Sequence, residues 1–86
     1  MDLKLESIII EIKAKGLFGK TDVEKYARYK KIAMKDELTY LYITGRESYQ
    51  KYREGALEVF GKDNAFFFDQ DNEWERFINR IVELLK

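Results

Sequence analysis

Hydrophobic residues recur along the chain with two different periods, and each change of period marks the boundary of an expected element. Short apolar runs rich in isoleucine, tyrosine or phenylalanine, bounded by glycine or polar residues, predict strands. The most apolar of these runs are 8–13, 38–44 and 65–69. Apolar residues spaced three and four apart predict helices. The expected helices are 22–35, 47–60 and a last one that is capped by Asp71 or Asn72 and ends at Leu85.

The first stretch, residues 2–15, fits both periods. Read as a helix, its apolar residues recur at i, i+3, i+4 and i+7. These residues are Leu5, Ile8, Ile9 and Ile12. Read as strands, its three consecutive isoleucines favour an extended backbone, because β-branched side chains lose rotamer freedom in a helix. We expect two antiparallel strands, 2–5 and 8–13, joined by a turn at Glu6 and Ser7.

This hairpin would bring three charged residues together. Its register sets Leu5 opposite Ile8 and Asp2 opposite Glu11, with directly opposed side chains on one face about 5 Å apart. Lys13 leaves the same face as Glu11, because the two residues are two positions apart on one strand. Two carboxylates this close repel each other unless a cation lies between them, and their hard oxygens suit Mg²⁺ or Mn²⁺. A lysine beside the ion could stabilise a developing charge.

The same residues resemble a known superfamily. Glu11-Ile12-Lys13 after an apolar strand looks like the E-x-K half of the PD-(D/E)XK nuclease signature. The segments 25–29 and 40–45 are similar to the helix and the strand that follow in that core. Asp22 stands near the place where many members carry a glutamine early in the helix. The resemblance covers roughly residues 2–70.

The resemblance implies a restriction-endonuclease-like core and a metal-dependent DNA endonuclease. Asp2 and Glu11 would bind Mg²⁺ or Mn²⁺, and Lys13 would position the nucleophile. The part of the core that usually precedes the signature is missing, so a homodimer or a larger assembly would complete it. The same loss also fits an inactive relative that only binds.

The expected helix 22–35 carries a basic stripe. It would begin with a capping box formed by Thr21 and Glu24. The stripe consists of Lys25, Arg28, Lys31 and Lys35, at spacings of three and four. We expect Lys25, Arg28 and Lys31 to contact the DNA backbone; the alternative is an ordinary solvated face. The expected buried side consists of Val23, Tyr26, Ala27 and Met34.

The order of elements predicts an α/β fold. Strands that alternate with helices favour right-handed crossovers and parallel pairing of the later strands, and the initial hairpin would make the sheet mixed. We therefore expect one domain over residues 1–86, with a small mixed or parallel sheet of three or four strands and three helices. Phe66, Phe67 and Phe68 alternate faces, so their strand should be central; at an edge it would leave apolar surface exposed and favour a dimer.

Composition narrows the function classes. The chain has 86 residues, with 16 basic and 16 acidic residues, so any nucleic-acid contact must come from local clustering of charge. It has no cysteine and no histidine, which excludes disulfides, thiolate metal sites and histidine-based catalysis. The acidic start shows no signal peptide, and no apolar run approaches membrane length. We expect a cytoplasmic protein without membrane contact.

Two other functions fit the sequence. Neutral charge and high aromatic content suit a small α/β interaction module, such as an inhibitor or immunity-type protein. Asp69-Gln70-Asp71 after the last strand, together with Glu11 and Gly45, resembles the metal site of Toprim domains.

Overall fold

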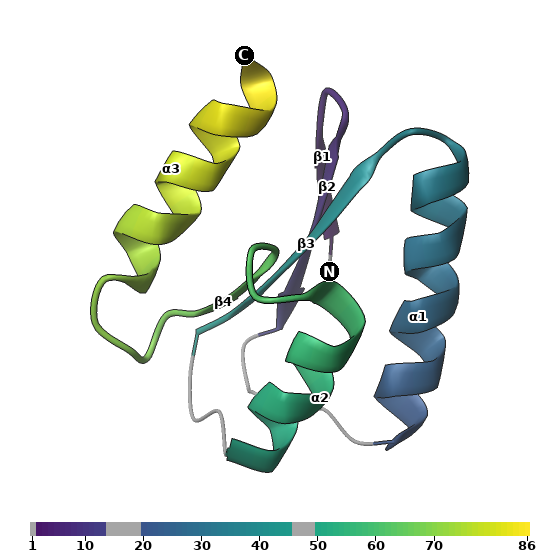
Figure 1. Ribbon diagram of the computed structural model, residues 1–86, viewed down its shortest axis with the longest axis vertical. Helices are drawn as coiled ribbons and strands as arrows, with labels where there is room; N and C mark the ends of the chain where they lie inside the picture. Colours follow the sequence, from purple (N-terminus) through teal and green to yellow (C-terminus); the bar gives the residue numbers. More distant parts are fainter. Residues whose placement is uncertain (1, 14–19, 46–49) are drawn as a thin grey trace.

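Within the described residues, four strands form one mixed sheet and three helices cover its two faces (Figure 1). The computed structural model describes residues 2–13, 20–45 and 50–86, without the side chains of residues 2, 3 and 50–52. The strands are β1 (Asp2–Leu5), β2 (Ile8–Lys13), β3 (Thr39–Thr44) and β4 (Ala65–Phe67), and the helices are α1 (Lys20–Lys35), α2 (Gln50–Phe60) and α3 (Glu73–Leu85). The strand order is β1-β2-β3-β4, which confirms the predicted α/β class.

The N-terminal stretch is a β-hairpin, as predicted. β1 pairs with β2 in the antiparallel direction, with Leu5 opposite Ile8 and Asp2 opposite Glu11. Glu6 takes a φ of 53° in the two-residue turn. β2, β3 and β4 are parallel, and α1 and α2 connect them. Two crossovers of the same hand that proceed in one direction across a sheet place their helices on the same face.

The face beneath α1 and α2 holds the larger core cluster. Its centre is Tyr42, which is stacked on Phe60 of α2 with ring centroids 5.2 Å apart. The buried members of this cluster are Tyr26, Ala33, Tyr40, Tyr42, Ala56, Val59, Phe60, Ala65 and Phe67. The Lys30 ammonium of α1 donates a 2.8 Å hydrogen bond to the Val59 carbonyl of α2, which ties the two helices together.

The opposite face of the sheet packs against α3 alone among the described helices (Figure 1). Phe77 of α3 lies against Phe66 of β4, with ring centroids 5.3 Å apart. The buried residues of this second cluster are Ile8, Ile10, Leu41, Phe66 and Phe77. None of the described helices is long and apolar enough to cross a bilayer.

Several predicted boundaries and buried faces were wrong in detail. α1 begins at Lys20, so Thr21 lies inside the helix and cannot be its N-cap, and the capping-box prediction fails. Met34 is 63% exposed, because it points about 100° around α1 from the buried Ala33 and so lies off the face that packs on the sheet. The predicted start of the second helix, residues 47–49, lies outside the described residues. Within α2, Ala56 and Phe60 are buried, whereas Leu57 is 37% exposed.

Only part of the apolar face of α3 packs against the sheet, and the rest of that face is exposed to solvent. Its N-cap is Asn72, in the left-handed region, without a side-chain cap hydrogen bond. Phe77 is buried, but Trp74 is 62% exposed, and Ile78, Val82 and Leu85 are also exposed. Residues 74, 78, 82 and 85 are spaced by one helical turn each, so they form one stripe. The helical periodicity predicts an inward stripe of Trp74, Phe77, Ile78, Ile81 and Leu85, and for Trp74, Ile78 and Leu85 this prediction is wrong.

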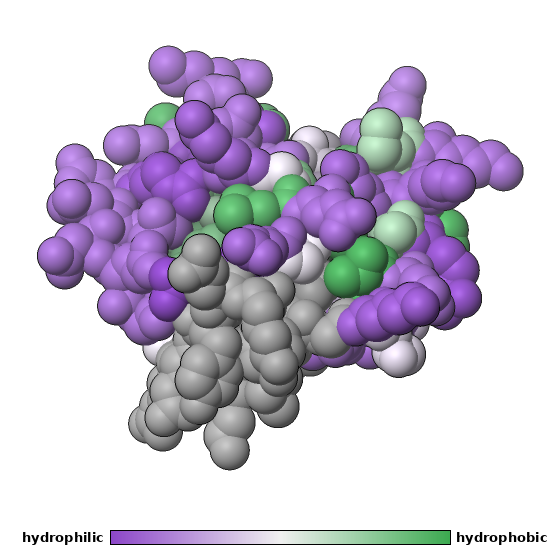
Figure 2. All heavy atoms as spheres, turned by 60° about the horizontal axis from the view of Figure 1, so that its bottom comes forward, coloured by the Kyte–Doolittle hydropathy of each residue, from purple (hydrophilic) through white to green (hydrophobic). Residues whose placement is uncertain are grey.

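The carboxyl ends of β2 and β3 lie at the end of the molecule that is drawn lowest in Figure 1. Figure 2 turns this end toward the viewer. Among the described residues, its surface is mainly hydrophilic, with smaller hydrophobic areas between the polar side chains. In α/β folds, this end of the parallel strands is where ligands bind.

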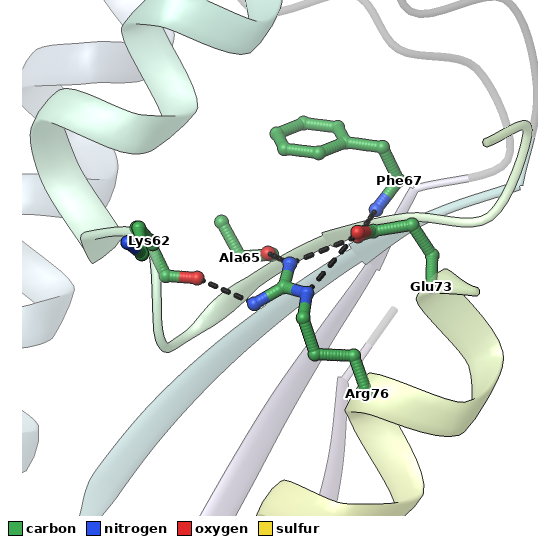
Figure 3. Close-up of polar contacts among 5 residues, drawn as sticks. All are labelled: Lys62, Ala65, Phe67, Glu73 and Arg76. Atoms are coloured by element: carbon green, nitrogen blue, oxygen red, sulfur yellow. Dashed lines mark hydrogen bonds and ion pairs between the residues drawn. The ribbon is translucent and has the colours of Figure 1, made fainter. Parts of the chain in front are cut away.

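β4 is an edge strand, and side chains of α3 cap its outer backbone (Figure 3). The Phe67 N–H donates to Glu73 Oε2 at 2.9 Å, and Arg76 Nη2 donates to the Ala65 carbonyl at 2.6 Å. Arg76 also donates to the Lys62 carbonyl and to both oxygens of Glu73. Because this cluster closes the edge, Phe66 and Phe67 are buried on opposite faces. The expectation that such a strand must be central was wrong.

Candidate metal-binding and catalytic site

The candidate site lies on the sheet face that α1 and α2 cover. In the parallel register Glu11 pairs with Tyr42 and Lys13 pairs with Thr44. Neighbouring residues in register point to the same side of a sheet. The side chains of Glu11 and Lys13 therefore lie beside Tyr42 and Thr44, between the sheet and α1.

Glu11 is a buried acidic residue with a defined hydrogen-bond donor. Its side chain is 8% exposed, and Oε1 accepts a 2.9 Å hydrogen bond from the Tyr40 hydroxyl. A buried carboxylate requires hydrogen bonds or an opposite charge, because it has lost its hydration. The tyrosine fixes the orientation of the carboxyl group relative to the sheet.

Lys13 is held in place by the first turn of α1. Its ammonium lies 3.3 Å from Asp22 Oδ1 and 5.4 Å from the centre of the Tyr26 ring. Lys25 lies over the same ring at 4.7 Å, and the neighbouring Tyr26 raises the pKa of Lys25. Tyr26 thus lies beside two ammonium groups, one from the carboxyl end of β2 and one from its own helix.

Tyr42 and Thr44 complete the buried polar row on β3. Burial is the main cause that raises the pKa of the Tyr42 hydroxyl, and nearby carboxylates act in the same direction. Thr44 Oγ1 is buried and has no hydrogen-bond partner in geometric range within the described residues. The Thr44 hydroxyl nearby lowers the Tyr42 pKa, but the increase that burial causes is larger.

The predicted metal pair is aligned by the backbone. Asp2 is directly opposite Glu11 in the β1–β2 register, which puts the two Cβ positions on one face about 5 Å apart. The side chain of Asp2 lies outside the described residues. Among the described side chains, no three acidic, histidine or cysteine residues gather around one point. The two carboxylates that the sequence predicts as ligands are hard oxygen donors of the kind that suits Mg²⁺ or Mn²⁺.

The predicted DNA-contacting residues do not all lie at this site. Lys25 contacts Tyr26 and so borders the site. Arg28 and Lys31 are exposed, two and five residues after Tyr26. At about 100° per residue, both therefore point to the far side of α1. Their contact with DNA stays a prediction, and the structure gives it no connection to Glu11.

The residues of the Toprim-like pattern are separated by the sheet. Asp69 and Asp71 are exposed in the turn after β4, whereas Glu11 is buried on β2, two strands away. Gly45 directly follows β3 and donates its N–H to the Lys13 carbonyl at 3.1 Å. Within the described part of the chain, no contact brings these four residues together, and the Toprim-like metal site stays a prediction.

Comparisons with protein-family models, with curated proteins and with solved structures found no match to this chain.

Sequence reasoning missed four residues of the site: Asp22 as the partner of Lys13, and the three tyrosines at 26, 40 and 42. One signal was present in the sequence. Tyr40, Tyr42 and Thr44 alternate along a predicted strand, so they share one face. Which face they share depends on the crossover through α1, and the local pattern does not specify it.

Proposed function

We propose that the chain is a metal-dependent DNA endonuclease of the PD-(D/E)XK type, with a restriction-endonuclease-like core. The observation that carries the proposal is the hairpin register, which sets Asp2 opposite Glu11 with Lys13 two residues further on the same face. A carboxylate pair can hold a divalent cation for phosphodiester hydrolysis, and an ammonium group beside it can stabilise the charge that develops.

Each residue of the site has a distinct role in this proposal. Asp2 and Glu11 would hold Mg²⁺ or Mn²⁺, which when bound supplies a polarised phosphate oxygen and a more acidic water. The Tyr40 hydroxyl keeps the Glu11 carboxyl oriented. Lys13, which Asp22 holds at 3.3 Å, would position the nucleophile and stabilise negative charge on the phosphate. Lys25 would contact the DNA backbone next to the site.

A nuclease assay in Mg²⁺ and in Mn²⁺ tests the proposal. Glu11→Gln keeps the size of the side chain and an oxygen that accepts the Tyr40 hydrogen bond, but removes the charge that binds metal. Glu58→Gln, an exposed residue of α2, is the matched control. We expect cleavage by the wild type and by Glu58→Gln, and at least about a 100-fold loss in Glu11→Gln and Lys13→Met. Equal activity in all four proteins, or activity that persists in EDTA, would refute it.

A non-catalytic interaction module is the second candidate, and the exposed stripe of α3 favours it. Trp74, Ile78, Val82 and Leu85 are all more than one third exposed. Apolar patches of this kind often mark protein contacts. The partner to test first is a second copy of the chain, since 16 basic and 16 acidic residues leave no net repulsion between copies.

Analytical ultracentrifugation distinguishes the second candidate. If α3 forms a homodimer, Ile78→Lys weakens the dimer, and Met34→Lys, at an exposed apolar residue of α1, does not. A wild-type monomer at millimolar concentration would exclude the homodimer.

A further inference from the structure

An open apolar groove begins beside the candidate site and runs along α1. It has a volume of about 370 Å³. Ile9 and Tyr40 form its floor, and Tyr29, Ile32 and Asp36 of α1 line its wall. Tyr40 belongs to both features, because its hydroxyl binds Glu11 while its ring lines the groove. Ile9 lies two residues before Glu11 on the same face, about 7 Å away along the strand.

The groove presents an aromatic ring and an aliphatic side chain to solvent. Tyr29 is 45% exposed and Ile32 is 61% exposed. The Tyr29 ring is fixed from behind by an edge-on contact with Tyr26, with centroids 5.9 Å apart. A rigid, half-exposed ring beside an apolar floor is the surface on which a planar heterocycle stacks.

Charged groups of both signs border the groove. Lys4 is directly opposite Ile9 in the hairpin. Because directly opposed residues share one face, the Lys4 side chain lies on the same side of the sheet as the groove. Lys25 is one turn before Tyr29 on α1 and lies over Tyr26. Asp36, at the far end, is an acceptor of the kind that binds the exocyclic amine of a base. Cations for phosphate, a ring for stacking and an acceptor for a base edge thus surround one groove.

We propose that this groove holds an unpaired base of a single-stranded DNA substrate, next to the phosphate that lies at Glu11. The inference rests on the proposed nuclease function and names its substrate. A base buried in a stacked duplex cannot reach the Tyr29 ring, whereas a single strand exposes both the base face and the backbone.

The distribution of charge also favours a single strand. Affinity for duplex DNA comes mainly from many phosphate contacts. The chain has no net charge, and Lys31 points about 200° around α1 from Tyr29. Arg28, one turn before Ile32, lies at the outer rim of the groove. Lys4, Lys25 and Arg28 suit a few phosphates of a flexible strand, and stacking supplies the remaining affinity.

Fluorescence anisotropy with a labelled oligodeoxycytidylate, whose bases carry the exocyclic amine that Asp36 would bind, in Ca²⁺ without Mg²⁺, tests the inference. We expect the single strand to bind at least about 10-fold more tightly than a duplex of equal length. Tyr29→Ala should weaken single-strand binding about 5- to 100-fold, and Tyr29→Phe should restore it, because the stacking ring is retained. Met34→Ala, about 140° around α1 from Tyr29, is the matched control and should bind as the wild type does. Circular dichroism confirms that each variant is folded.

The outcomes separate the groove from the nuclease proposal. Equal or tighter duplex binding, no binding, or no effect of Tyr29→Ala would overturn the groove inference. Single-strand binding that depends on Tyr29, with no cleavage in Mg²⁺ or Mn²⁺, would support the groove and contradict the nuclease. If both proposals hold, Glu11→Gln abolishes cleavage and keeps single-strand binding, and Tyr29→Ala mainly raises KM.

Discussion

The hydrogen bond between Tyr40 and Glu11 gives the sharpest prediction about the stability of the site. Both residues are buried, with exposed fractions of 6% and 8%, and their oxygens lie 2.9 Å apart. Tyr40→Phe removes only the donor and leaves the ring, which is packed edge-on against Phe60, in place. The variant therefore isolates what one hydroxyl contributes to a buried carboxyl group.

The expected loss of stability follows from the geometry. A hydrogen bond to a charged group contributes about 1.5–3 kcal/mol, and losing it at a buried position also leaves the carboxylate less well solvated. We therefore expect Tyr40→Phe to lower the free energy of unfolding by about 1.5–3 kcal/mol. For a domain of this size, that corresponds to a fall in Tm of roughly 6–24 °C.

A double-mutant cycle measures the pair directly by urea denaturation. The variants are Tyr40→Phe, Glu11→Leu and the double variant, with Tyr29→Phe as a control that removes an exposed hydroxyl. Each single change removes one side of this hydrogen bond, whereas the double change removes both sides. The double variant should be more stable than the sum of the single losses predicts, by at least about 1 kcal/mol. Additive losses, or a Tyr40→Phe variant as stable as Tyr29→Phe, would refute this account of Glu11.

Three further predictions concern stability. Arg76→Lys should cost about 2–3 kcal/mol in urea denaturation, because the guanidinium caps the edge of β4, whereas Arg28→Lys on the exposed face of α1 should cost under about 0.5 kcal/mol. Gly61→Ala should lower the free energy of unfolding by about 1 kcal/mol, because Gly61 has a φ of 81°, which strains a residue with a Cβ. The added Cβ meets no atom within 4 Å, so a steric clash adds nothing to this cost. Above pH 10, stability should fall, because Tyr42 ionises near its ordinary pKa of 10.0 in the unfolded chain but above it in the fold. Tyr42→Phe should flatten that alkaline loss, and an unchanged pH profile would contradict the assignment.

The hairpin was predictable because its information is local. Three consecutive isoleucines favour a strand, a two-residue turn fixes the register, and the register alone sets Asp2 opposite Glu11. The order of the later elements was predictable in the same way, because strand-like apolar runs alternate with segments of helical hydrophobic spacing. These local signals were sufficient for the fold class and for the register of the hairpin.

The partners of those charged residues were not predictable from local pattern. The contact of Tyr40 with Glu11 depends on the parallel register of β2 and β3. The contact of Asp22 with Lys13 depends on the position of α1 against the sheet. Both are set by packing between distant segments. The position of α3 is a similar case. Arg76 ties α3 to the edge strand β4 through the Ala65 carbonyl. In this position α3 leaves Trp74 exposed, although the sequence pattern predicts that Trp74 belongs to the core.

The central claim is that Asp2 and Glu11 together bind a divalent cation, and Mn²⁺ titration followed by electron paramagnetic resonance tests it most directly. The account predicts one bound Mn²⁺ per chain, displaced by excess Mg²⁺, with binding lost in Asp2→Asn and in Glu11→Gln and kept in Glu58→Gln. Binding that survives both changes at the hairpin, or no binding by the wild type, would contradict it.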